Sequence, residues 1–347
     1  MRSSKKKKAL VLIGFALFFC FGNFLMNLAL VEPSYMGVHY RILEEEGPFD
    51  LITIGTSHGQ SGIVPAKVEE ESGLKMMNLC VAGEYLQDSY YMLRHALKYQ
   101  KPKAIYYELD FTYWLTEPNY QSNTIMREMP WSFNKLEYFF VQMGHQDFRA
   151  VFFPWMYTRD VLKNMPVLKN YVYLKIQKEY RDKQPEGLYE KGCYDHGYIM
   201  GCTVPNEEKE AYCPRQWEAD KTKMAEHIQG MREYLEKIIA LCRENGIEFK
   251  IFVTPIPEET YQKDLANQKA VDAYMKEMAK EYGVPYYNLN YLKRDLLPLT
   301  GSEFQDWEGH LGGLAPRFSQ LFGKLIRDQQ NGTFQESDYL DPYKWEK

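Results

Sequence analysis

Short apolar runs alternate with longer amphipathic stretches over most of the chain. Each run has the length of a strand, and each stretch carries apolar residues at helical spacing, which predicts successive βαβ units. Such alternation is typical of a doubly wound α/β fold with a mostly parallel sheet. The predicted strands are residues 51–55, 75–81, 103–111, 247–255 and 285–290. The predicted helices are residues 65–72, 85–100, 224–246, 268–282 and 314–327.

The first 31 residues do not follow this pattern. Arg2 and the four lysines at positions 5–8 are followed by residues 9–31, which contain no charged side chain. About 20 apolar residues suffice to span a bilayer, whereas a cleaved signal peptide has an apolar region of about 7 to 15 residues and a small-residue cleavage site. The sequence therefore predicts an uncleaved transmembrane anchor at the cell membrane. The lysines are expected in the cytoplasm and the remaining chain outside it.

The alternation also breaks down between residues 113 and 217 and then resumes. This interval is rich in aromatic residues, proline and glycine, and only residues 135–142 and 171–180 look helical. We interpret it as a large insertion within one domain. The expected organisation is a cytoplasmic cluster with its anchor (1–31), a membrane-proximal linker (32–48), an α/β domain (49–330) and an irregular tail (331–347).

Composition and charge narrow the classes of partner. The chain has 347 residues, and its 45% apolar and 15% aromatic content fits a folded globular protein. The net charge is −5, but five of the 42 basic residues lie in the first eight positions, which leaves 37 basic against 47 acidic residues elsewhere. Nucleic acid is therefore not an expected partner.

Three of the six cysteines, Cys193, Cys202 and Cys213, lie close together in the insertion. An extracytoplasmic location permits a disulfide between two of them, although three cysteines leave one unpaired, so the disulfide state stays open. No C-x-x-C pair occurs and only His196 lies nearby, so neither a metal site nor another cofactor is expected.

The first predicted strand ends in the sequence "GTSHGQSG", residues 55–62. Ligands bind at the carboxyl ends of strands in open α/β sheets, and a sharp turn after Gly55 would expose the Ser57 hydroxyl there. A helix N-cap or an ordinary turn explains the same residues equally simply.

A second candidate segment is "FQDWEGHLGGLA", residues 304–315, just before the last predicted helix. A serine hydroxyl becomes a good nucleophile when an imidazole takes its proton, and a carboxylate fixes the tautomer of that imidazole. Asp306 and His310 would supply this pair from one loop. A solvated histidine between charged neighbours in a surface loop is the alternative.

The two segments together resemble the SGNH/GDSL hydrolases. The resemblance is closest to their membrane-anchored branch, which includes the D-alanyl-transfer protein of teichoic acid modification and partners of membrane-bound O-acyltransferases. It implies a flavodoxin-like fold of the SGNH-hydrolase type and covers about residues 49–111 and 221–327. The matching segments are residues 55–58, 62–83, 96–110 and 306–315.

By this resemblance Ser57 is the nucleophile and His310 is the general base, oriented by Asp306. Members of the family bind the oxyanion with the backbone N–H of the nucleophile, a glycine of the second block and an asparagine of the third. Gly83 matches the glycine, and such donors are usually the largest contribution to catalysis of acyl transfer.

The sequence departs from the family pattern in two ways. No G-x-N-D occurs in the third block, where Glu108 and Asp110 stand, so the third oxyanion donor is open. The family has its acid three residues before the histidine, whereas Asp306 is four before His310, which leaves Glu308 as an alternative acid.

Three further sites carry residues of interest. His58 is adjacent to Ser57 in the sequence and is therefore interpreted as a structural or substrate-contacting residue rather than the base. Asn78 is interpreted as a hydrogen-bonding residue of the second strand. The sequence "CYDHGY", with Tyr194, Asp195, His196 and Tyr198, is either part of a lid or sugar-binding wall or an ordinary surface loop.

The sequence hypothesis is an extracytoplasmic serine O-acyltransferase or esterase that modifies a cell-envelope polysaccharide through an acyl-enzyme. The resemblance implies an integral membrane O-acyltransferase as a partner. One alternative is a catalytically silent polysaccharide-binding or scaffolding subunit, which the missing asparagine favours. Another is D-alanyl transfer to teichoic acid. The sequence does not distinguish transfer from hydrolysis.

Overall fold

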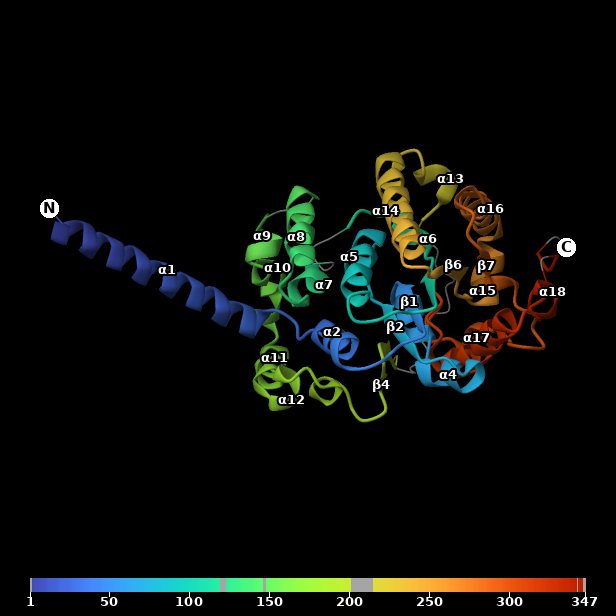
Figure 1. Cartoon of the computed structure of the whole chain (residues 1–347), viewed down its shortest axis with the longest axis horizontal. Helices are drawn as coiled ribbons and strands as arrows, with labels where there is room; N and C mark the ends of the chain where they lie inside the picture. The colour runs from blue at the N-terminus through green and yellow to red at the C-terminus, as the bar shows by residue number, and fades with distance from the viewer. Residues whose placement is uncertain (1, 119–122, 146–147, 201–214, 342, 346–347) are drawn as a thin grey trace. The chain divides into compact units, whose positions relative to one another are not determined.

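Five parallel strands form the central sheet in the order β2-β1-β3-β6-β7 (Figure 1). All five lie where the sequence predicts a strand. Every residue of β1, β2 and β3 is buried, as expected when helices cover both faces of a parallel sheet. The bounds are β1 (Leu51–Gly55), β2 (Met76–Cys80), β3 (Ala104–Glu108), β6 (Glu248–Val253) and β7 (Tyr286–Asn288). The prediction of an α/β fold with a parallel sheet is thus confirmed.

Helices cover both faces of this sheet because its crossovers run in two directions. The chain moves from β1 outward to β2 and then back past β1 to β3, so right-handed connections leave helices on opposite faces. Helix α17 packs against α4, and α14 packs against α5 (Figure 1). The bounds are α4 (Pro65–Ser72), α5 (Leu86–Ala96), α14 (Ala225–Glu244), α16 (Leu265–Tyr282) and α17 (Ala315–Gln330). Shorter helices are α3 (Ser57–Gly62), α6 (Phe111–Trp114), α13 (Trp217–Asp220) and α15 (Glu258–Lys263).

The computed structural model describes residues 2–118, 123–145, 148–200, 215–341 and 343–345. The chain divides into two compact units, one of Met1–Val38 with Asn119–Glu190 and the other of His39–Pro118 with Lys191–Lys347. Most of the expected insertion therefore belongs to the same unit as the N-terminal helix, and only its two ends, residues 113–118 and 191–217, belong to the α/β unit.

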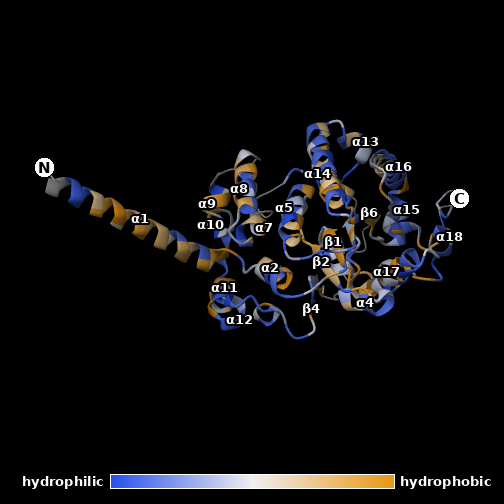
Figure 2. Ribbon diagram, in the orientation of Figure 1, coloured by the Kyte–Doolittle hydropathy of each residue, from blue (hydrophilic) through white to orange (hydrophobic). Residues whose placement is uncertain are grey.

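The first unit is helical. Its helix α1 (Arg2–Leu30) is the one helix, among the described residues, that is long and apolar enough to cross a membrane. Figure 2 shows apolar residues along most of its length. Helix α8 contains the predicted helical segment 135–142, and the predicted segment 171–180 covers the end of α11 and most of α12, with a break at Gln177. The bounds are α7 (Asn123–Glu128), α8 (Phe133–His145), α9 (Phe148–Phe152), α10 (Trp155–Thr158), α11 (Met165–Ile176) and α12 (Lys178–Arg181).

The predicted membrane-proximal linker and the tail predicted to be irregular both contain ordered structure. The linker contains helix α2 (Met36–Glu45), whose residues Tyr40 and Leu43 are fully buried. The tail contains α18 (Glu336–Tyr339), and its Trp345 is stacked on Tyr261, with ring centroids 4.7 Å apart. In both segments buried aromatic and aliphatic side chains fix a backbone whose polar residues suggest a loop.

Candidate functional site

The candidate residues gather at the carboxyl ends of the parallel strands. Ser57 follows β1, Gly83 follows β2, Asp110 follows β3, and the loop with His310 follows β7. Strand β1 lies between β2 and β3, so connections leave its carboxyl end on both faces of the sheet. Ligands bind at such switch points in open α/β sheets.

The turn after β1 is held against β3 by a close backbone approach. Gly55 has φ +144°, and a Cβ at this position would lie 2.6 Å from the carbonyl oxygen of Glu108. Helix α3 then begins at Ser57, where the sequence predicts only a sharp turn. Asn78 anchors this helix by donating to the carbonyls of Gly59 and Ile63, both at 2.9 Å. Asn78 is thus a hydrogen-bonding residue of β2, in agreement with its interpretation.

Glu108 lies under the turn that presents Ser57. Its Oε2 accepts hydrogen bonds from the N–H of Thr56 at 2.9 Å and from the hydroxyl of Thr56 at 2.8 Å. Its Oε1 accepts from the Thr254 hydroxyl at 3.1 Å. Burial and the nearby Asp110 raise the pKa of Glu108 to about 7, against the opposing effect of these donors. The side chain therefore fixes the backbone next to Ser57 without contacting the solvent.

We expect Glu108→Gln to remove a pH dependence of stability. The carboxyl titrates at 4.5 ordinarily and at about 7 in the folded protein, so the unfolded chain loses the proton first. The parent's free energy of unfolding should therefore fall by about 3 kcal/mol as the pH rises from about 4.5 to above 7. Thermal melting of the full chain in detergent micelles over this range should show a larger fall for the parent than for Glu108→Gln. Parallel curves would contradict the buried, proton-binding role of Glu108.

Asp306 and His310 form a close pair on the loop after β7. His310 Nδ1 lies 2.7 Å from Asp306 Oδ2. Asp306 Oδ1 accepts from the backbone N–H groups of Glu308, Gly309 and His310 at 3.0 to 3.1 Å. Asp306, not Glu308, therefore holds the imidazole, and the loop wraps its backbone around the carboxylate. This backbone path requires glycine at position 309. Its φ is +119°, and a Cβ added there would lie only 2.5 Å from the Ile256 side chain.

The pair shifts both pKa values in the direction of a stable ion pair. Burial alone would lower the pKa of His310, but the hydrogen bond and charge of Asp306 outweigh it and raise that pKa above 6.5. Burial would raise the pKa of Asp306, and the donors from His310 and the loop backbone lower it below 3.8. Asp306 therefore fixes Nδ1–H on the ring and leaves Nε2 as the basic atom.

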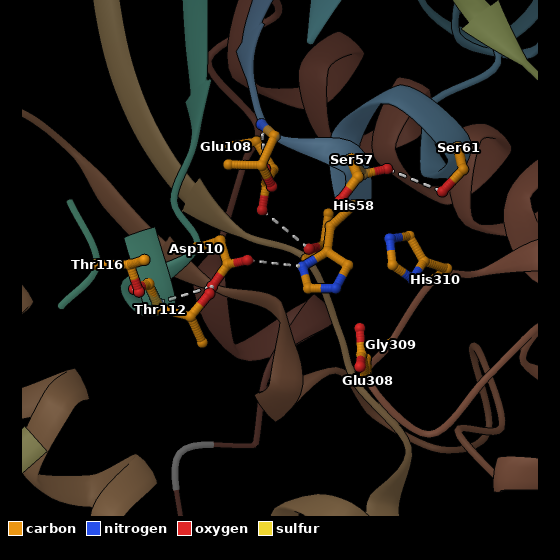
Figure 3. A network of polar contacts seen from close by, with 12 residues as sticks. Ser57, His58, Ser61, Glu108, Asp110, Thr112, Thr116, Glu308, Gly309 and His310 are labelled. Carbon is orange, nitrogen blue, oxygen red and sulfur yellow. Dashed lines mark hydrogen bonds and ion pairs between the residues drawn. The ribbon is translucent and has the colours of Figure 1, made fainter. Parts of the chain in front are cut away.

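His58 lies inside the site, between a carboxylate and the second imidazole (Figure 3). Its Nδ1 is 3.4 Å from Asp110 Oδ2, and its ring centroid is 4.6 Å from that of His310. Burial lowers the pKa of His58, with Asp110 acting in the opposite direction and His310 in the same one. A neutral His58 next to a cationic His310 avoids two like charges in a buried site.

Tyr113 is a site residue that sequence reasoning missed. The backbone N–H of Gly83 and the side chain of Ser57 both act to lower the pKa of its phenol. Burial and then Asp110 raise its pKa to about 12, and the contacts with Gly83 and Ser57 oppose this rise. Its carbonyl oxygen lies 2.9 Å from His227 Nε2, and its ring packs edge-on to Tyr85 at 5.2 Å. Tyr113 is thus held on three sides.

Asp110 connects Tyr113 and His58. Its Oδ1 accepts from the N–H and hydroxyl of Thr112, at 2.9 and 2.7 Å, and so caps helix α6, which carries Tyr113. Its Oδ2 is the oxygen that faces His58. Glu108 therefore supports the turn at Thr56, and Asp110 caps helix α6. The sequence "ELD" reveals neither role.

The segment "CYDHGY" lies at the edge of the sheet. Strands β4 (Tyr194–Asp195) and β5 (Tyr198–Ile199) form a small hairpin. The carbonyl of His196 accepts from the N–H of Asn78 in the edge strand β2 at 2.8 Å. Asp195 accepts from the N–H of Ala66 at 2.8 Å. These contacts favour a structural surface loop over a lid or sugar-binding wall.

The structure describes one of the three clustered cysteines. Cys193 is free, whereas Cys202 and Cys213 lie outside the described residues. Within the described residues no group of three histidine, cysteine or acidic side chains could hold a metal ion.

No model of a known protein family matches the sequence, and no curated protein matches it significantly. The function of this protein is therefore inferred from the geometry of the site and from the short motifs of the sequence.

Proposed function

We propose that the protein is a serine esterase or O-acyltransferase of the SGNH-hydrolase type. The observation that carries the proposal is the hydrogen-bonded pair of Asp306 and His310 at the sheet edge where β1 delivers Ser57. His310 would take the proton of the Ser57 hydroxyl through Nε2. The serine oxygen would then form an ester with the acyl carbon of the substrate.

Protonated His310 then gives its proton to the departing oxygen of the donor ester, which completes the first half of the reaction. In the second half, water or a sugar hydroxyl enters, loses its proton to His310 and takes the acyl group from Ser57. The departing Ser57 oxygen regains its proton from His310. Asp306 holds the ring through both steps and stabilises its charged form.

Saturable hydrolysis of p-nitrophenyl acetate by the full chain in detergent micelles tests this reaction. The activity should disappear in proportion to labelling by a fluorophosphonate, which reacts with activated serines. Hydrolysis that continues after complete labelling would contradict the proposal. A folded chain that neither hydrolyses nor becomes labelled would favour a silent polysaccharide-binding subunit.

We further assign the third oxyanion donor to Tyr113. The family pattern supplies an asparagine there, and this chain has none in its third block. The support for this assignment is that the Gly83 N–H and the Ser57 side chain both lower the pKa of the Tyr113 phenol, which would put an acyl oxygen bound to Ser57 and to the Gly83 N–H near that phenol. A neutral phenol with a pKa of about 12 keeps its proton for donation.

We expect Tyr113→Phe to lower kcat by about 10²-fold or more with a smaller change in KM, since one lost oxyanion donor costs about 10² to 10³ in rate. Tyr85→Phe is the matched control, because its hydroxyl donates to the carbonyl of Glu117 at 3.0 Å and not to the site. Unchanged or faster turnover by Tyr113→Phe would overturn the assignment of Tyr113.

The proposed setting is the outer side of the cell membrane. Helix α1 is long and apolar enough for a span, and the lysines before it favour a cytoplasmic N-terminus. Lys175 donates to the carbonyls of Asn27 and Leu28, at 3.0 and 3.1 Å, and also to that of Val31. These contacts make α1 part of a folded unit, which supports an anchor over a cleaved signal sequence.

The proposed acceptor is a cell-envelope polysaccharide or teichoic acid, with acetyl or D-alanyl as the acyl group and an integral membrane O-acyltransferase as the supplier. The support is the resemblance together with the anchor. Replacing α1 by an unrelated membrane helix should weaken polymer acylation in cells and leave ester hydrolysis by the purified chain intact. Equal loss of both activities would contradict the supplier.

A further inference from the structure

A chain of aromatic rings leads from α1 to α8 within the helical unit. The Phe19 ring on α1 meets Phe153 edge-on, with centroids 5.8 Å apart. Phe153 lies 6.4 Å from Phe152, and Phe152 lies 5.6 Å from Phe139 on α8. Phe139 in turn lies 5.6 Å from Phe140. Phe152 and Phe153 thus connect α8 to the apolar helix α1.

Hydrogen bonds join the same segments. Asn23 is a polar side chain within the apolar run of α1. Its amide donates to the carbonyl of Phe152 at 3.2 Å and accepts from Trp155 Nε1 at 2.8 Å. A polar group within a bilayer has no water to bind and must find its partners in the protein. Residues 152 and 155 supply both partners.

The position of these contacts along α1 gives their depth. Phe19 lies ten residues after Ala9, the first residue beyond the lysines, and Asn23 lies fourteen after it. At 1.5 Å per residue these distances are about 15 and 21 Å, inside a hydrocarbon core about 30 Å thick. If α1 spans the bilayer, the residues bound to Phe19 and Asn23 reach the same depth.

The surface of α8 is apolar where a soluble helix would be polar. Phe133, Leu136 and Phe140 are spaced on one side of the helix, and their exposed fractions are 92%, 43% and 63%. Trp131, just before α8, is 85% exposed, and Lys135 lies over its ring at 4.7 Å. Exposed phenylalanine and leucine beside tryptophan and lysine are typical of a helix at a membrane interface.

We propose that α8, α9 and α10 are embedded in the bilayer leaflet next to the C-terminal half of α1, with lipid acyl chains covering Phe133, Leu136, Phe140 and Phe152. The apolar surface of α1 continues beside them, since Leu17, Phe18 and Phe21 are exposed as well. The protein is then anchored in the membrane by several helices of the helical unit rather than by a single transmembrane helix.

Lipid is the occupant that this geometry favours over a second protein. The surface is continuous with a helix that itself has the length and composition of a span, and it begins at the depth of Phe19. The proposal is independent of the chemistry at Ser57, because none of its residues belongs to that site.

The test uses the full chain, purified alone and reconstituted into phosphatidylcholine nanodiscs, with a solvatochromic fluorescent amino acid at one position per sample. The positions are Phe140, Phe133 as a second site on α8, Leu17 as a position on α1, and Tyr99 as an exposed aromatic residue of the α/β unit. Quenching is measured with nitroxide-labelled lipids and, separately, with aqueous iodide.

We expect lipid nitroxide to quench the probes at Phe140 and Phe133 several-fold more strongly than the probe at Tyr99, and iodide to show the reverse order. The Leu17 probe should behave like the two α8 probes. Iodide quenching at Phe140 and Phe133 equal to that at Tyr99, with Leu17 protected, would overturn the proposal and favour a protein partner on this surface. Iodide access at Leu17 as well would overturn the span itself.

Discussion

Ser57→Ala should abolish ester turnover by the full chain, with a loss of at least about 10³-fold, because the proposed mechanism forms the acyl-enzyme on the Ser57 hydroxyl. The loss should appear in kcat, since the methyl side chain keeps the fold of α3 and removes only the reacting oxygen. The measurement is the initial rate of p-nitrophenyl acetate hydrolysis in detergent micelles over a range of substrate concentrations.

Ser61→Ala is the matched control for this substitution. Ser61 lies one turn further along α3, and its hydroxyl donates to the carbonyl of Ser57 at 2.9 Å (Figure 3). Its loss removes one local hydrogen bond and leaves the Ser57 hydroxyl in place. If both variants kept the parental rate, the serine mechanism would be wrong; if both lost it equally, the effect would be one of folding.

His310→Gln is expected to lower kcat by about 10²- to 10⁴-fold, the usual contribution of a general base. The parent should also lose activity on the acid side of its pH profile. Only neutral His310 can accept the serine proton, and Asp306 raises the pKa of His310 above 6.5, so the rate should fall as the pH drops through that raised pKa. The pH dependence of kcat/KM reports this pKa directly.

Variants of the two acidic neighbours separate their roles. Asp306→Asn removes the partner at 2.7 Å and should shift the acid limb to lower pH while it lowers the rate. Glu308 raises the pKa of His310 only through its charge. Glu308→Gln should therefore change the acid limb and the rate much less. Equal effects of the two variants would contradict the assignment of Asp306.

Most of the sheet could be predicted from the sequence because its strands are buried on both faces. The run before Gly55 ends where β1 ends, and Pro65 and Gly73 bound α4 as their backbone preferences require. Helix α3 could not be predicted, since its residues read as a turn. Asn78 from another strand stabilises it by binding two of its carbonyls.

The apolar N-terminal helix and two helical segments of the first unit could be predicted, but the packing of this unit could not. Asn23 and Trp155 are 132 positions apart, and no local pattern signals their hydrogen bond. The aromatic residues between 119 and 190 therefore looked like an irregular insertion. Their order comes from packing on α1, which a periodicity argument does not detect.

The site was predictable in part. Ser57, Asp306, His310 and Gly83 stand in short motifs whose order along the chain is informative. The contact of Glu108 with Thr56 depends on the pairing of β3 with β1, and the position of Tyr113 depends on the Asp110 cap and on His227 of α14. Such contacts require the register and the packing, so only the structure identifies them.

The most direct test of the central claim is the site of covalent labelling. The full chain in detergent micelles is treated with a fluorophosphonate, its intact mass is measured, and the modified peptide is sequenced by mass spectrometry. We predict one adduct per chain, on Ser57, formed much more slowly in His310→Gln and absent in Ser57→Ala. An adduct on another residue, or a folded parent that stays unlabelled at long times, would contradict the assignment of Ser57 as the nucleophile.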